Sequence, residues 1–252
     1  MRSSHFPDTR WSLIDAIGRG EAEAFDALSQ VCEIYWYPIY AFFRDQRKSH
    51  HDAQDLTQGF FEGVLRRQDF SKLDQSKGNF RAFLSASARN FAIKEYYRMK
   101  TDKRGGGKVF SGFDEELAEK LYSKDRLHKG GGSPEMIYDK RWGMALLGTV
   151  MERLRAEAES KGKADEFAAL EGYLDPNGRE APVKKVAKKL KKTEGAVRTE
   201  VFRYRQRYGK LLRLEIARLV NGPEEVEEEI SYLVELMGKD SGAESDSWLL
   251  NE

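Results

Sequence analysis

Apolar residues recur along most of this chain at steps of three and four, the spacing that places them on one face of an α-helix. Polar or glycine-rich stretches separate these segments. No convincing stretch of alternating apolar and polar residues indicates a β-strand. The pattern therefore predicts an all-α fold, with two small helical domains joined by a flexible linker and a C-terminal amphipathic helix after them.

In the N-terminal part the pattern predicts helices over residues 22–47, 52–66 and 80–98. Pro38 lies inside the first of these and should kink or divide it, because proline lacks the N–H that a helix interior needs. Asp52 is the expected N-terminal cap of the second. We expect four aromatic residues of the first helix to lie in the core, and the alternative is a platform on which bases stack. These residues are Tyr35, Trp36, Tyr37 and Tyr40.

The helix over 80–98 should bury one face and expose a basic one. The inward face is expected to hold Phe80, Phe83, Leu84, Ala88, Phe91 and Tyr96. The outward face collects Arg81, Arg89, Asn90, Lys94, Tyr97 and Arg98. Cations can follow phosphates, an amide can pair with a base edge, and rings can stack on unpaired bases. A solvated helix face would have a similar composition, so both interpretations stay open at this point.

Glycine triplets at 105–107 and 130–132 bracket a charged segment, which contains a short amphipathic piece over 115–121, and predict a linker over residues 105–134. The first domain then covers 1–104 and the second 135–220. In the second domain, Pro134 suits a helix start. The expected inward residues on its first two helices are Trp142, Leu146, Val150, Leu154, Phe167, Leu170 and Tyr173. An acidic tail with one amphipathic helix follows over 221–252.

Residues 181–220 are the most informative stretch, with thirteen Lys and Arg against three acids. A short helix with Val186 and Ala187 inward is followed by a break and then by a second, Arg-rich helix. Thr193 is a good cap for that second helix. Two helices joined by a tight turn in this way are typical of a helix-turn-helix. Lys191 occupies the turn position where glycine is usual, because the backbone there is left-handed.

A basic amphipathic helix can also be a plain solvated surface or can meet acidic lipid. Three details favour DNA here. The small residue Ala187 stands where the two helices must approach closely, Val197 stands where the second helix returns to the core, and the positive charge lies on both helices. DNA binding is therefore the preferred interpretation of this stretch.

Composition and charge add few constraints. The net charge of +1 conceals a net of +10 over residues 181–220 followed by −9 over 221–252. Cys32 is the only cysteine, which excludes an intrachain disulfide and a cysteine-rich metal site. His50 and His51 make only a weak metal site, and we expect no metal and no cofactor. No apolar run approaches the roughly 18 residues of a membrane helix, and no signal peptide is evident, so a cytoplasmic protein is expected.

The order of these segments resembles a bacterial sigma factor of the extracytoplasmic-function group. The resemblance is carried by DAQDLTQGFFEGVL, GNFRAFLSASARNFAIKEYYR, the linker and the helix-turn-helix, over about residues 9–104 and 139–218. It implies that core RNA polymerase, through its clamp coiled coil and flap, and promoter DNA are the partners. It also leaves room for an anti-sigma protein. No membrane contact and no catalytic site are implied.

The resemblance implies roles for particular residues. The clamp contact would use Asp52, Asp55, Gln58 and Glu62. The minus-ten strand would meet Asn79, Arg89, Asn90, Lys94, Tyr97 and Arg98. At the minus-thirty-five element, the helix that starts at Thr193 would enter the major groove. Base edges would be met by Glu194, Arg198 and Thr199, and phosphates by Lys192, Arg203 and Arg205. Phe83 stands where the group often has tryptophan, and the segments 101–132 and 221–252 exceed a minimal member.

Two functions from different classes of mechanism remain in view, with an enzyme disfavoured because no nucleophile, base or cofactor loop is recognisable. One is a sigma factor that directs promoter-specific initiation. The other is a stand-alone helix-turn-helix regulator, which needs only the C-terminal half. For the acidic tail, one hypothesis is that it masks the basic recognition surface. The alternative is that its helix packs on the second domain for stability alone.

Overall fold

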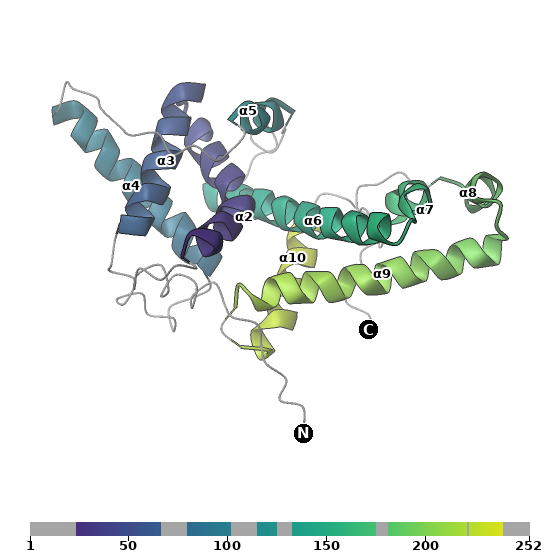
Figure 1. The fold of residues 1–252 in the computed structure, drawn as a ribbon. Coiled ribbons are helices and arrows are strands. Elements are labelled where there is room, and N and C mark those ends of the chain that lie inside the picture. The colour runs from purple at the N-terminus through teal and green to yellow at the C-terminus, as the bar shows by residue number, and fades with distance from the viewer. Residues whose placement is uncertain are drawn as a thin grey trace. The chain divides into compact units, whose positions relative to one another are not determined.

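The structure is a computed structural model, and it describes residues 24–66, 80–101, 115–124, 133–174, 181–220 and 222–238. Within these ranges it contains nine α-helices and one short 3-10 helix, and no strand (Figure 1). The predicted all-α fold class is confirmed. Among the described residues, no helix is long and apolar enough to span a lipid bilayer.

The described residues belong to two compact units, each of which we treat by itself. The N-terminal unit holds the described parts of 24–145 and residues 219–220, and the helix-turn-helix unit holds 146–218 and 222–238. The division falls inside helix α6 (Pro134–Ser160), later than the predicted linker at 105–134. Glycine content marks a loop, but it does not tell which part of a long helix packs with which core.

The N-terminal unit is built from α2 (Ala24–Asp45), α3 (His50–Arg66), α4 (Phe80–Thr101), α5 (Glu115–Lys124) and the start of α6. Aromatic side chains fill its core, where Trp36 stacks on Phe61 with ring centroids 5.5 Å apart. Tyr35, Trp36 and Tyr40 are at most 2% exposed, which confirms the core interpretation for these three. A base-stacking role for them is thereby excluded.

Two local predictions for this unit are corrected. Of the two effects predicted for Pro38, a kink or a division, the division is wrong, since α2 continues through Pro38 as one helix. The cap of α3 is Ser49, not Asp52: the Asp52 amide donates to Ser49 Oγ at 3.1 Å, and Ser49 Oγ donates back to the Asp52 carboxylate at 2.8 Å. This reciprocal arrangement resembles a capping box, and it starts the helix two residues earlier than predicted.

The helix-turn-helix unit contains the rest of α6, α7 (Ala164–Leu170), the 3-10 helix η4 (Glu171–Tyr173), α8 (Val183–Leu190), α9 (Glu194–Ala217) and α10 (Glu224–Gly238). The predicted inward residues Leu146, Val150, Leu154, Phe167, Leu170 and Tyr173 are all buried. The Tyr208 hydroxyl donates to the Leu147 carbonyl at 3.2 Å and ties α9 to α6. Regular spacing of apolar residues therefore predicted this unit well.

Candidate nucleic-acid interface

The turn between α8 and α9 has the geometry that the sequence predicts for a helix-turn-helix. Lys191 is left-handed, with φ of 53° and ψ of 41°, and its amide donates to the Lys188 carbonyl. The Lys192 amide donates to the Ala187 carbonyl at 3.0 Å. Thr193 is extended and its hydroxyl accepts from the Ala196 amide at 3.1 Å, which caps α9. A left-handed C-terminal residue and a hydroxyl cap thus end α8 and begin α9 within three residues.

A small apolar cluster holds α8 and α9 together beside the turn. Six buried residues from η4, α7, α8 and α9 form it: Leu170, Tyr173, Val186, Ala187, Val197 and Val201. The predicted close-approach residue Ala187 is 6% exposed, and Val197 is fully buried. The Tyr173 hydroxyl also donates to the Ala181 carbonyl, which fixes the chain just before α8. The first turns of α9 are therefore presented to solvent from a rigid support.

The exposed surface of these first turns contains three of the predicted base-reading residues. Glu194, Arg198 and Thr199 are all exposed. The Thr199 hydroxyl donates to the Gly195 carbonyl at 3.0 Å. In the part of the chain that the structure describes, the Arg198 guanidinium has no hydrogen-bond or ion-pair partner. Arg198 is accordingly the predicted residue best placed to meet a base or a phosphate.

Three predicted phosphate ligands are engaged within the protein. Lys192 Nζ pairs with Glu166 of α7, and Arg203 Nη1 pairs with Glu200 at 3.1 Å. Arg205 donates from Nε and Nη2 to the Tyr173 carbonyl, at 3.1 and 2.9 Å. The sequence could not reveal these partners, because Glu166 and Tyr173 lie more than twenty-five positions before their cations. Of the three, Arg203 keeps its side chain mostly exposed.

The charges around Glu166 stabilise the support of the interface. Burial raises the pKa of this carboxyl, but hydrogen bonds from Lys192 and Lys163 outweigh that effect and leave its pKa lowered. Burial, followed by the charges of Glu166 and Glu200, raises the pKa of Tyr204 to about 12. Glu166 is therefore ionised at neutral pH and Tyr204 is neutral. The pair Lys192–Glu166 links α7 to the residue just before the cap of α9.

Sequence reasoning missed one residue of this surface. Phe202 is 63% exposed, an unusual state for a phenylalanine in a helix. It lines a shallow hollow together with Arg198, Arg205 and Val183. The signal was present in the sequence, because Phe202 follows buried Val201 and so falls outside the inward spacing of Val197, Val201 and Tyr208.

The acidic tail helix does not cover this end of α9. Arg213 near the other end donates to the Glu227 carboxylate from Nε at 2.7 Å and Nη2 at 3.2 Å. Figure 1 shows α10 crossing α9 close to the C-terminus of α9. Arg198 and Arg213 are fifteen residues apart on one helix, which is about 22 Å. Val226, Ile230 and Leu233 of the tail helix are buried, so the described part of the tail is packed.

In the N-terminal unit, the residues that the family resemblance assigns to the polymerase contact lie along α3. Asp52 and Asp55 are exposed, whereas Gln58 and Glu62 are half-buried. The opposite face of α3 is buried through Ala53, Leu56 and Phe60. An acidic face of this helix is thus open to solvent. Among the described residues, no group of three His, Cys, Asp or Glu is arranged to hold a metal ion.

Two residues of α4, one near each end of the helix, lie on the opposite face from the one predicted. Arg81, expected outside, is 8% exposed; it pairs with Asp139, and its guanidinium lies 4.9 Å above the Trp142 ring. Tyr96, expected inside, is 50% exposed. The partners of Arg81 come from α6, some sixty residues later, so helical spacing could not identify them. The predicted inward residues Leu84 and Ala88 are buried, so the expected face is kept, and the ion pair adds Arg81 to it.

The remaining predicted residues of α4 stay near the surface. Asn90, Lys94, Tyr97 and Arg98 are exposed, and Arg98 pairs with Glu95 at 2.7 Å. Arg89 is half-exposed and pairs with Glu135 at the start of α6. Asn79 lies outside the described residues. Exposed Ile93, which the sequence analysis did not select, adds apolar surface beside Tyr96 and Tyr97.

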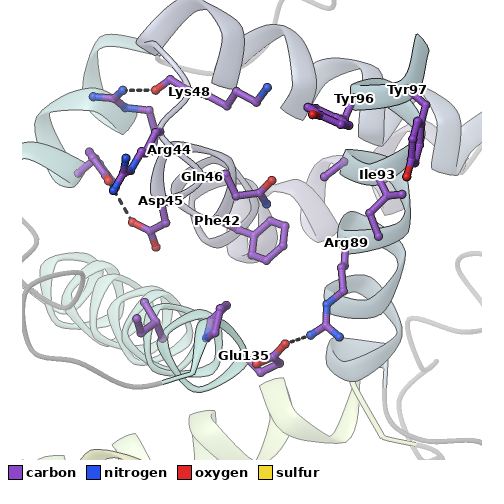
Figure 2. Close-up of a pocket in the computed structure, with 15 residues that line it drawn as sticks. Phe42, Arg44, Asp45, Gln46, Lys48, Arg89, Ile93, Tyr96, Tyr97 and Glu135 are labelled. Carbon is purple, nitrogen blue, oxygen red and sulfur yellow. Dashed lines mark hydrogen bonds and ion pairs between the residues drawn. The ribbon is translucent and has the colours of Figure 1, made fainter. Parts of the chain in front are cut away.

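A hollow of about 890 Å³ opens beside this part of α4 (Figure 2). Its walls come from the end of α2, from α4, from Tyr122 of α5 and from the first turn of α6. Tyr96 and Tyr97 stand at one end of the hollow and Arg89 at another, as Figure 2 shows. Arg44, Arg47 and Lys48 supply further positive charge. Aromatic rings among cations are the composition of single-strand binding grooves.

Comparison of the chain with models of known protein families found no match, and comparisons with curated proteins and with solved structures found none either.

Proposed function

We propose that this protein is a promoter-specificity factor, which binds core RNA polymerase, opens and reads promoter DNA, and leaves the chemistry to the polymerase. The observation that carries the proposal is the helix-turn-helix, with a capped recognition helix α9 whose first turns present Arg198 to solvent. A helix of this kind enters the major groove with its N-terminal residues on base edges. In the proposal it reads the minus-thirty-five element.

The N-terminal unit supports the same proposal through two further surfaces. The exposed carboxylates of Asp52 and Asp55 on α3 offer an acidic face to a basic partner. In the proposal this partner is the polymerase clamp, with Gln58 and Glu62 at the edge of the contact. The hollow beside α4, with Tyr96 and Tyr97, would take the melted minus-ten strand, because rings stack on unpaired bases of any sequence.

Transcription from genomic promoter fragments by core polymerase plus the full-length protein tests the proposal. We expect promoter-dependent transcripts, an at least tenfold loss with Arg198→Ala, and a loss of polymerase binding with Asp52→Asn plus Asp55→Asn. Lys161→Ala is the matched control, since Lys161 is an exposed residue of the turn after α6. Absence of both polymerase binding and promoter-dependent transcripts at modest salt would refute the proposal.

A second candidate is a stand-alone helix-turn-helix regulator. The observation in its favour is that the helix-turn-helix unit has its own apolar cluster, in which α7, α8 and α9 pack together. This candidate predicts specific duplex binding without polymerase and a palindromic footprint. It also predicts that the double Asp52 and Asp55 variant regulates transcription as the unchanged protein does. Duplex binding without polymerase, together with the effect of the double variant on transcription, therefore separates the candidates.

A further inference from the structure

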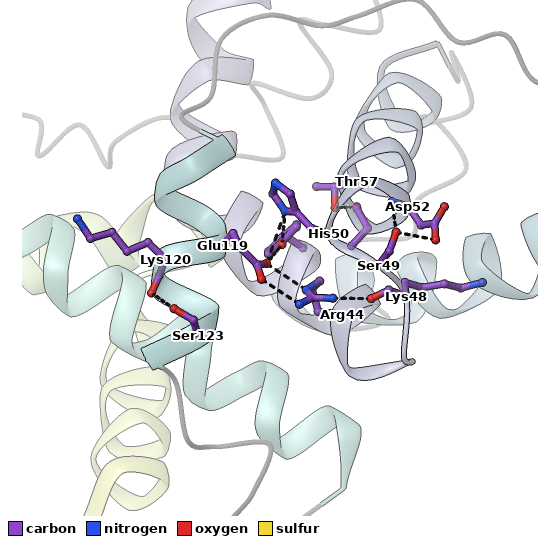
Figure 3. A network of polar contacts seen from close by, with 11 residues as sticks. Arg44, Lys48, Ser49, His50, Asp52, Thr57, Glu119, Lys120 and Ser123 are labelled. Atoms are coloured by element: carbon purple, nitrogen blue, oxygen red, sulfur yellow. Dashed lines mark hydrogen bonds and ion pairs between the residues drawn. The ribbon is translucent and has the colours of Figure 1, made fainter.

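Helix α5, which lies in the segment expected to be a linker, is attached to α2 through one carboxylate. Glu119 accepts two hydrogen bonds from the Arg44 guanidinium, at 3.1 Å from Nε and 2.9 Å from Nη2, and one from the Tyr40 hydroxyl (Figure 3). Its Oε2 also lies 3.5 Å from His50 Nδ1. A two-bond guanidinium–carboxylate contact fixes orientation as well as distance.

The hydrogen-bond donors around Glu119 are arranged to hold a carboxylate. His50 Nδ1 lies 2.8 Å from the Tyr40 hydroxyl oxygen. Tyrosine has a single hydroxyl proton, and Tyr40 gives it to Glu119, so His50 must supply the proton between Nδ1 and Tyr40. Tyr40 and Arg44 thus donate to the Glu119 carboxylate, and His50 donates to the Tyr40 hydroxyl oxygen. Burial, followed by Glu119 itself, raises the pKa of Tyr40 and keeps its proton in place.

Tyr122 makes the second attachment of α5. Its hydroxyl donates to Asp45 at 3.0 Å, and the Arg44 guanidinium lies 4.8 Å from its ring centroid. Next to it on α5, Leu121 is 43% exposed. Glu119 and Arg44 are themselves partly exposed. Because partly exposed ion pairs contribute little to stability, the Glu119–Arg44 pair is a weak attachment of α5.

Both attachments bear on the hollow beside α4. Tyr122 forms part of the wall of the hollow, and Arg44 lines it while its guanidinium binds Glu119. The cation is therefore neutralised by the chain itself when α5 is docked. A phosphate oxygen and a carboxylate oxygen make the same contacts with a guanidinium, so the two compete for Arg44.

We propose that α5 is an intramolecular competitor of nucleic acid: docked, it occupies Arg44 with Glu119 at the wall of the hollow; released, it leaves Arg44 to a phosphate of a single strand. This inference rests on the proposed function, in which the hollow takes the melted strand. The alternative is that α5 only braces α2. In that case its release would leave strand affinity unchanged or lower it.

The test uses full-length Glu119→Gln, which keeps the shape of the side chain and removes its charge. The probe is a fluorescein-labelled single-stranded oligonucleotide, titrated by anisotropy at several salt concentrations. We expect affinity to rise about five- to tenfold, the effect of one gained phosphate contact, and the logarithmic salt slope to steepen by about 0.7. Hydrogen exchange of residues 115–124 should become faster in the variant, which reports release of α5 independently.

Two further variants sharpen the result. Glu152→Gln removes an equal charge from an exposed position of α6 in the other unit and should leave strand affinity as it was. Adding Arg44→Gln to Glu119→Gln should abolish the gain, because the phosphate ligand is then missing. A gain that survives this double variant would overturn the competition for Arg44.

The remaining outcomes are decisive as well. Faster exchange of α5 without tighter binding would show that α5 is a brace, and unchanged exchange would show that Glu119 does not hold it; either result overturns the inference. If no variant binds the oligonucleotide even at low salt, strand capture by the proposed function fails and the competitor role fails with it. The exchange measurement then still reports whether α5 is docked, so the two failures can be distinguished.

Discussion

The turn between α8 and α9 and the outer face of α4 are both basic surfaces, yet the sequence predicted them with different success. At the turn, the left-handed Lys191, the Thr193 cap and the buried Val197 all agree with prediction. On α4, Arg81 is buried where an exposed cation was expected, and Tyr96 is exposed where a buried ring was expected. Local chemistry decides the first surface, whereas a partner distant in sequence decides the second.

The difference has a physical cause. The turn is defined by backbone hydrogen bonds and caps between residues three to five positions apart, which a sequence displays directly. The burial of Arg81 depends on Asp139 and Trp142 of α6, with which it makes a mostly buried ion pair and a cation–ring contact. A buried charge requires a specific partner, and that requirement can outweigh the small preference of one ring for the interior.

Removing the buried cation of α4 should have the largest effect on this comparison. Arg81→Met breaks the mostly buried ion pair with Asp139, and we expect a loss of about 3 kcal/mol in the free energy of unfolding. Urea denaturation followed by circular dichroism measures it. In the control Arg89→Met, the pair with Glu135 is half-exposed and the loss should be below about 1 kcal/mol. Equal losses would mean that the two arginines have the same role.

The two arginines of α9 should separate stability from DNA binding. Arg205→Ala removes two charge-assisted hydrogen bonds to the Tyr173 carbonyl and should cost about 1.5–2 kcal/mol of stability. Arg198→Ala should leave the unfolding transition in place and weaken specific duplex binding by about 1–3 kcal/mol. Denaturation and duplex titration of both variants check this. The opposite assignment of effects would contradict the described geometry.

Loss of the cap of α9 should have a moderate effect. Thr193→Ala removes the oxygen that accepts from the Ala196 amide, and we expect a loss of about 1 kcal/mol. Thr193→Ser keeps that oxygen and is the matched control. Thermal denaturation of the two variants gives the difference, and an identical transition for both would rule out the cap as a source of stability.

A gain of similar or smaller size is expected at the turn itself. Lys191 has a left-handed backbone, which disfavours a side chain and suits glycine. Lys191→Gly should therefore raise the free energy of unfolding by up to about 1 kcal/mol. Lys189→Gly, in the last turn of α8, should lower it instead, because the backbone there is helical and glycine loses more conformational freedom than lysine. A destabilising Lys191→Gly would show that the turn is not left-handed in solution.

The smallest effect is the pH dependence of the stability that the Arg207–Glu157 ion pair contributes between α9 and α6. The hydrogen bond from Arg207 holds the pKa of Glu157 below its usual range. The pair therefore contributes stability at neutral pH, and this contribution is lost as pH falls through the lowered pKa. Both side chains are partly exposed, so we expect only about 0.5 kcal/mol. The difference between the protein and Glu157→Gln in urea should shrink from pH 7 to pH 3.

Part of the candidate site could be read from the sequence because it is local. The helix-turn-helix, its cap, its left-handed residue and its exposed Arg198 all follow from periodicity and turn chemistry. The internal partners of Lys192 and Arg205 could not be read, since Glu166 and the Tyr173 carbonyl belong to other helices. Charge was therefore a good guide to the surface and a poor guide to which cations remain available.

The sequence by itself determined the all-α class, the position of the turn and the apolar faces of α6 and α7, since helical spacing fixes which residues share a face. Only the tertiary structure decided that Arg81 is buried, that the tail helix packs at the far end of α9, and that Glu119 of the expected linker binds Arg44. Each of these depends on a contact between residues well separated in the chain. Such contacts depend on which helices pack against each other, and helical periodicity shows only which residues share a face of one helix.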